Sequence, residues 1–105
     1  MNRFGLHGKL TAQPGQRDAL VQILLEAAEL LNAVPGCEIY FVSTSLAEPD
    51  AIWVTEVWRS EADHAQSLSL PAVRELIGRA KPIIAGMSDS ARTVPVGGKG
   101  LPVPR

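Results

Sequence analysis

The segment that most constrains the fold is the eight-residue run 51–58, AIWVTEVW, which is apolar on both of its alternating sides. Its β-branched and aromatic residues predict a β-strand, in which successive side chains point to opposite faces of the sheet. The two faces carry Ile52, Val54 and Trp58 and, opposite them, Trp53, Thr55 and Val57. Both faces of this strand should therefore be covered.

A chain of 105 residues is the size of one domain, so it must cover both faces with little material. Its helices can cover one face of a three- or four-stranded sheet. A second copy of the chain is the remaining candidate for the other face. The sequence therefore predicts a homodimer, with Trp53 packing at the interface and Trp58 on the opposite face.

Hydrophobic periodicity along the chain predicts the order strand, helix, strand, strand, helix, strand. The strands are expected over 4–10, 37–45, 51–58 and 90–96, and the helices over about 20–34, from Ser60 onward and from Pro71 to Pro82. This order is that of a ferredoxin-like α+β unit. We expect one domain over residues 1–96 and a Pro/Gly-rich tail over 97–105.

The third strand and the second helix are joined at Ser60, which is placed to cap the helix. Asp63 is at the position that completes a capping box, and Glu61 suits the positive end of the helix. The segment containing Glu56, Trp58 and His64 is therefore predicted to be the junction of a strand and a helix.

Charge and cysteine content exclude several classes of protein. Ten Lys and Arg against eleven Asp and Glu give a net charge of −1 without a basic run, which disfavours a nucleic-acid partner. The single cysteine, Cys37, cannot form an internal disulfide or a common zinc cluster. No apolar signal-peptide core and no run of eighteen apolar residues is present. We expect a cytoplasmic protein with no membrane partner.

An ordered set of motifs over residues 4–95 resembles the antibiotic biosynthesis monooxygenase family, which includes cofactor-free quinol and anthrone oxygenases. The motifs are Pro14-Gly15, Pro35-Gly36-Cys37 leading to Tyr40, Glu56-Val57-Trp58, His64 and Pro71. The resemblance implies a dimeric α+β barrel with a pocket between sheet and helices. It also implies that a hydroxyaromatic anion reacts there with dioxygen, without metal or other cofactor.

The resemblance implies roles for the polar residues near the end of the third strand. His64 is the candidate base, because imidazole takes up a proton near neutral pH. Trp58 and Tyr40 are candidate pocket walls and hydrogen-bond donors. Glu56, a carboxylate among apolar neighbours, is expected to orient His64, to bind an arginine or to act as the base itself.

Three further residues are candidate substrate-binding groups, namely Arg74, Arg79 and His7. An arginine on the last helix could neutralise a phenolate. His7 could also join Glu56 and His64 in a two-histidine, one-carboxylate iron site, although such sites usually show tighter local spacing.

Departures from family patterns narrow the substrate. Relatives that degrade haem carry an asparagine in the first strand, where this chain has His7-Gly8. They also carry an axial histidine in the second helix, where this chain has about Leu68, so haem degradation is disfavoured. Anthrone oxygenases of the family carry an asparagine at the position of Val54, and its absence here counts against their particular substrate. A different class of function also stays open, a non-catalytic dimeric module that binds a small aromatic ligand.

Overall fold

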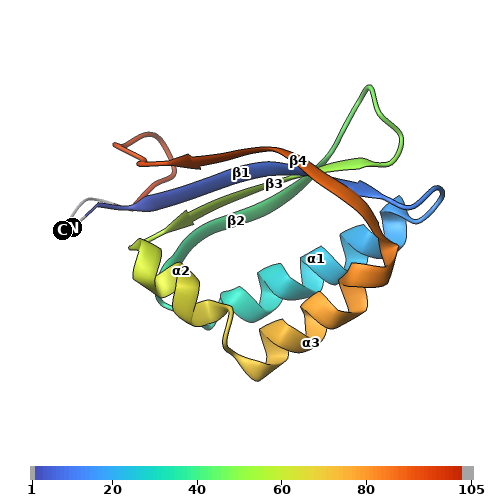
Figure 1. Cartoon of the computed structure of the whole chain (residues 1–105). Coiled ribbons are helices and arrows are strands. Elements are labelled where there is room, and N and C mark those ends of the chain that lie inside the picture. Colours follow the sequence, from blue (N-terminus) through green and yellow to red (C-terminus); the bar gives the residue numbers. More distant parts are fainter. Residues whose placement is uncertain (1, 103–105) are drawn as a thin grey trace.

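A computed structural model describes residues 2–102 of the chain. Its elements are β1 (Phe4–Ala12), α1 (Arg17–Leu31), β2 (Cys37–Thr44), β3 (Ala51–Trp58), α2 (Glu61–Ser67), α3 (Pro71–Ala80), a 3₁₀ turn (Lys81–Ile83) and β4 (Ile84–Thr93). The strands form one antiparallel sheet in the order β2-β3-β1-β4. The three helices lie on one face of this sheet (Figure 1). The predicted ferredoxin-like α+β fold is confirmed.

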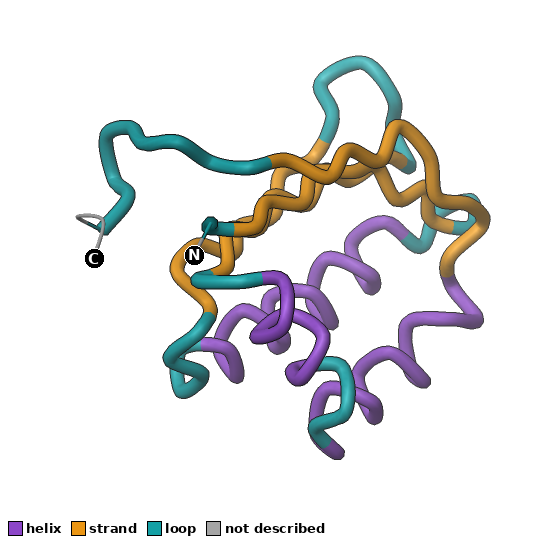
Figure 2. The backbone as a smooth tube through the Cα atoms, turned by 60° about the vertical axis from the view of Figure 1, so that its left-hand side comes forward, coloured by secondary structure: helices purple, strands orange, loops and turns teal. Residues whose placement is uncertain are grey.

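β3 lies inside the sheet, between β2 and β1. Its side chains Ile52, Val54 and Trp58 are buried against the helices. The opposite face, called here the outer face, carries Trp53 and Thr55 and is left without a helix (Figure 2). Phe41 of β2 pairs with Thr55 and is 51% exposed. The second copy of the chain that would cover this face stays a prediction.

Two hydrophobic clusters lie between sheet and helices. One joins Leu20 of α1 and Ala80 of α3 to Ile52 and Val54. The other contains Phe4, Leu31 and Trp58. Tyr40 packs against both clusters. The candidate site described below lies between them.

The start of α2 follows the sequence prediction in part. The Ser60 hydroxyl accepts a hydrogen bond from the Asp63 backbone N–H at 3.1 Å, as an N-cap should. The Asp63 carboxylate, predicted to complete a capping box, instead accepts from Arg59 Nε at 2.8 Å. The Ser60 N-cap was predicted correctly, whereas the predicted return bond from the Asp63 side chain is replaced by the bond to Arg59.

The last strand begins earlier than predicted, at Ile84, and ends at Thr93. It contains Gly86 and Asp89, residues that strands usually disfavour. Its pairing with β1 shifts register between His7 and Lys9, and Asp89 has a φ of 53°, so a bulge interrupts the alternation there. The strand forms because β1 supplies its hydrogen-bonding partner.

The tail is described as far as residue 102, and Pro102 accepts a hydrogen bond from the Arg3 guanidinium. The remaining predicted tail, 103–105, lies outside the described residues. No helix within 2–102 has the length and apolarity needed to cross a membrane.

Candidate functional site

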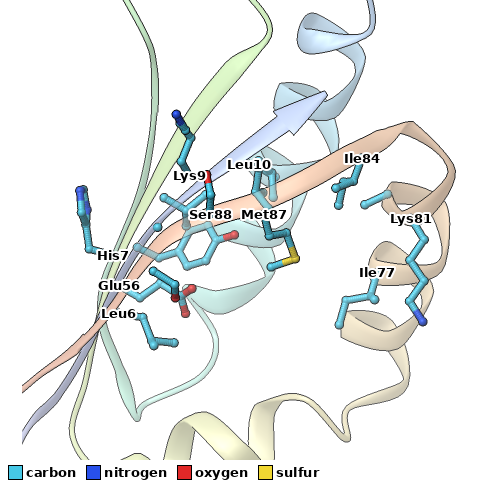
Figure 3. Close-up of a pocket in the computed structure, with 16 residues that line it drawn as sticks. Leu6, His7, Lys9, Leu10, Glu56, Ile77, Lys81, Ile84, Met87 and Ser88 are labelled. Carbon is cyan, nitrogen blue, oxygen red and sulfur yellow. The ribbon is translucent and has the colours of Figure 1, made fainter. Parts of the chain in front are cut away.

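Two adjoining chambers lie between the sheet and the helices. The first, called here the His64 chamber, has a volume of about 140 Å³ and includes Trp58, His64 and Leu76 in its wall. The second, the Met87 chamber, has a volume of about 420 Å³ and is shown in Figure 3. Both chambers share the wall residues Leu24, Tyr40, Glu56, Ile77 and Ala80. A ligand that spans both must pass these residues.

Glu56 is a largely buried carboxylate at the junction of the chambers. It lies in β3 between Tyr40 of β2 and Leu6 of β1. Its Oε1 atom accepts a hydrogen bond from Trp58 Nε1 at 2.9 Å. Burial raises the pKa of Glu56, while the Trp58 bond and His64 oppose that rise. The carboxylate is thus held in one orientation in a mostly apolar setting.

His64 reaches the same point from the helical side. Its Nε2 atom is 3.9 Å from Glu56 Oε1, beyond hydrogen-bonding distance but close enough for charge attraction. Its ring packs edge-on against Trp58, with centroids 5.3 Å apart, and against Phe4 at 5.4 Å. The cap at Ser60 fixes the start of α2 and so helps to set where His64 lies. A negative Glu56 would stabilise the imidazolium that forms when His64 accepts a proton.

Tyr40 borders both chambers from β2, where it pairs with Glu56. Burial raises the pKa of Tyr40 well above its usual value, and the neighbouring Glu56 and Cys37 add to this. Its phenol is therefore protonated at neutral pH and can donate a hydrogen bond to a ligand oxygen.

The structure brings together four of the predicted site residues, namely Tyr40, Glu56, Trp58 and His64. The Trp58 N–H, predicted as a donor to substrate, is donated to Glu56 instead. Trp58 therefore forms a wall of the His64 chamber and also orients the carboxylate.

The structure places the two predicted arginines away from the chambers. Arg74 is exposed on α3, and Arg79 pairs with Glu26 of α1 and with Glu75. Neither borders either chamber. Arg79 turns toward α1 because Glu26 supplies a carboxylate there, so neither arginine is placed to neutralise a phenolate.

His7 is also separated from the cluster. Its ring stacks on Trp53 of the outer face at 5.0 Å, and its Nδ1 atom lies 2.9 Å from Thr55 Oγ1. In Figure 3 the His7 side chain points away from the Met87 chamber, although the residue borders it. His7 and His64 therefore lie on opposite faces of the sheet, and the iron site weighed above does not assemble.

Within residues 2–102 no three His, Cys, Asp or Glu side chains are grouped to hold a metal ion. Cys37 lies near Tyr40, and burial raises the pKa of its thiol to about 11, with Glu56 and Glu38 adding to the effect. At neutral pH this cysteine is a neutral thiol rather than a reactive thiolate.

Several residues of the Met87 chamber were missed by sequence reasoning. They come from β1 and from the first half of β4, and include Gly8, Leu10, Ile84 and Met87. The predicted last strand began at residue 90, which left Ile84 and Met87 without a place in the sheet. The available signal was the alternation of Leu6, Gly8 and Leu10, which puts a glycine on the helix-facing side of β1.

Comparison with known protein families gives one match, to the model described as "Antibiotic biosynthesis monooxygenase", over residues 3–79. A crystal structure named for the same family, from Chloroflexus aurantiacus J-10-fl, is 49% identical, with a TM-score of 0.88. The match covers 95% of this chain and 99% of that one. The search of curated proteins gave no match.

Two other structures named for this family are more distant. The one from Deinococcus radiodurans is 26% identical with a TM-score of 0.71, and the match covers 97% of this chain and 99% of that one. The one from Caulobacter crescentus CB15 is 20% identical with a TM-score of 0.83, covering 91% and 92%, and supports the fold alone. These names give a family and no substrate.

Proposed function

This chain belongs to the antibiotic biosynthesis monooxygenase family, and on that basis we propose that it oxidises a small quinol or polycyclic phenol with dioxygen. Family membership supports a monooxygenase-like role in general. The finer proposal is that the protein needs no metal or flavin, since an electron-rich aryloxide can react with dioxygen directly. An anthrone is included in the substrate class.

The observation that carries the proposal is the junction of the two chambers. There a mostly apolar space meets one imidazole, one buried carboxylate and one protonated phenol, from His64, Glu56 and Tyr40. Direct oxygenation needs a base near neutral pH, dry walls and a donor for the developing oxyanion. These three groups and the surrounding apolar walls can supply all of them.

In the proposed mechanism, His64 takes the proton from the substrate hydroxyl. The resulting imidazolium is stabilised by Glu56, whose Oε1 lies 3.9 Å from Nε2. Tyr40 donates a hydrogen bond to the substrate oxyanion, and Trp58 holds Glu56 in position. Glu56 itself is the second candidate for the base, because burial raises its pKa above that of an exposed glutamate.

In the proposed oxygenation, one phenol and one dioxygen molecule give one quinone and one water molecule. The aryloxide electron pair forms a C–O bond between a ring carbon and dioxygen, and the imidazolium returns its proton to the distal oxygen. Loss of the ring proton then turns the C–H electron pair into the new C=O as the O–O bond breaks. The departing hydroxide takes up that proton and leaves as water.

We also propose that the protein is a homodimer formed through the outer face. The partly exposed Phe41 and Trp53 of that face are large apolar side chains with no helix over them. A second copy could cover them by packing sheet against sheet. This is the arrangement that the resemblance implies.

The test of the function is oxygen uptake by the chelator-treated protein with a panel of hydroquinones and anthrones. His64→Gln keeps the size of the side chain and removes the base, so its rate should fall to the autoxidation control. Arg74→Gln, at an exposed position away from both chambers, is the matched control and should keep the wild-type rate. Thermal stabilisation by quinones without oxygen uptake would favour the binding-module alternative.

A further inference from the structure

We propose that the ligand has two parts, a single hydroxylated ring in the His64 chamber and a larger apolar body in the Met87 chamber. This inference rests on the proposed function, because it places the reacting hydroxyl at the junction where His64, Glu56 and Tyr40 meet. It assigns a class of substrate, a phenol that is extended by an alkyl chain.

The volumes of the two chambers indicate what size of group each can hold. A cavity of about 150 Å³ in a protein core is known to hold one benzene molecule. The His64 chamber, at about 140 Å³, is therefore the size for one ring. The Met87 chamber, at about 420 Å³, has room for a body several times larger.

The residues shared by the two chambers show where a ligand would pass from one to the other. Glu56 and Tyr40 border both chambers, whereas His64 and Trp58 border only the smaller one. A ring seated against Trp58 has its far edge at the junction. Because the reacting hydroxyl lies on that same edge, a substituent on the neighbouring ring carbon must then enter the Met87 chamber.

Gly8 keeps the larger chamber open. It lies on the helix-facing side of β1, opposite Val54, where a larger side chain would fill the space. A Cβ atom built at Gly8 would meet Ser90 at 3.6 Å, which is ordinary contact, so packing does not demand glycine there. The missing side chain leaves volume for a ligand.

The exposed part of the wall of the Met87 chamber includes two large apolar side chains, beside Lys81. Met87 is 76% exposed and Ile77 is 39% exposed, and both belong to its wall. Figure 3 shows Met87 of β4 and Ile77 of α3 on the side of the chamber away from Glu56 and Leu6. An apolar body in the chamber would cover Met87, which borders only this chamber and which a single ring in the His64 chamber would leave in water.

The experiment measures the affinity of a series of 2-alkylphenols, from methyl to octyl, by calorimetry without dioxygen so that no turnover occurs. We expect affinity to rise by up to about fourfold per added methylene until the Met87 chamber is filled. Gly8→Leu should abolish this rise and leave the affinity for 2-methylphenol within about twofold of wild type. Met87→Gln, at a largely exposed position that does not threaten folding, should reduce the rise.

A matched variant in the other chamber is Ala27→Leu, because Ala27 borders only the His64 chamber. It should weaken every member of the series by a similar factor. An affinity that does not depend on chain length, or a rise that survives Gly8→Leu in a folded protein, would overturn the two-part ligand. If small quinols still gave oxygen uptake in that case, the proposed function would stand and only the two-part ligand would be wrong. A chain-length effect without oxygen uptake would support the two-part ligand and contradict the proposed function.

Discussion

Trp58 and Glu56 should be energetically coupled, and the coupling should depend on pH. The indole N–H donates to the carboxylate at 2.9 Å, Trp58 is 1% exposed, and the Glu56 side chain is 18% exposed. A hydrogen bond to a charged group in such a setting contributes about 1.5–3 kcal/mol. A double-mutant cycle of Trp58→Phe and Glu56→Leu isolates this value, because the loss of ring volume cancels between its two sides.

The sign of the pH dependence follows from the direction of the pKa shift. Burial raises the pKa of Glu56 above its value in the unfolded chain, so the native state holds the proton more tightly. The contribution of this proton to the free energy of unfolding is complete below the pKa of Glu56 in the unfolded chain. It is lost as the pH rises through the pKa of Glu56 in the folded chain. Trp58→Phe removes a bond that favours the charged form, so it raises the folded pKa further. The variant should therefore lose additional stability as the pH rises above the pKa that Glu56 has in the unfolded chain.

The assay is urea unfolding at one protein concentration, followed by the fluorescence of Trp53, which remains in every variant. We expect a coupling of about 2 kcal/mol at pH 7 that falls to about 1 kcal/mol once Glu56 is protonated. A coupling below about 0.5 kcal/mol at pH 7, or one that does not change with pH, would refute the reasoning.

Three further predictions follow from the same structure. His64→Gln should lower kcat by about a hundredfold or more in the oxygen-uptake assay, whereas Arg74→Gln should leave kcat unchanged. The proposed dimer should dissociate in the Phe41→Glu variant, as measured by sedimentation velocity, and a wild-type protein that is already monomeric would contradict the proposed interface. Ser60→Ala should lower the free energy of unfolding by about 1 kcal/mol in urea titrations, because the Asp63 backbone N–H at the start of α2 would lose its acceptor. An unchanged urea midpoint would contradict this prediction.

Most of the fold could be predicted because its elements carry strong local signals. The two-sided pattern of 51–58 gave β3 with its bounds, and Ser60 marked the start of α2. β4 was misplaced because its bulge at Asp89 breaks the alternation on which strand prediction depends. Its strand character comes from pairing with β1, which is information that its own residues do not contain.

The site could be predicted where geometry is local. Glu56 and Trp58 share a face because they are two residues apart in a strand, and the capped helix that follows returns His64 to them. Arg79 could not be placed, because its direction is set by Glu26 on another helix, 53 positions away. The Met87 chamber depends on the pairing of β1 with β4, so Gly8 and Met87 gained meaning only in the folded chain.

The central claim is direct oxygenation at the junction of the two chambers, and one labelling measurement tests it. Chelator-treated protein is supplied with an extended phenol under oxygen-18, and the product is analysed by mass spectrometry against protein-free and His64→Gln controls. The account predicts a quinone carrying one labelled oxygen atom, formed faster than in either control. Label that appears no faster than by autoxidation across the phenol panel would contradict it.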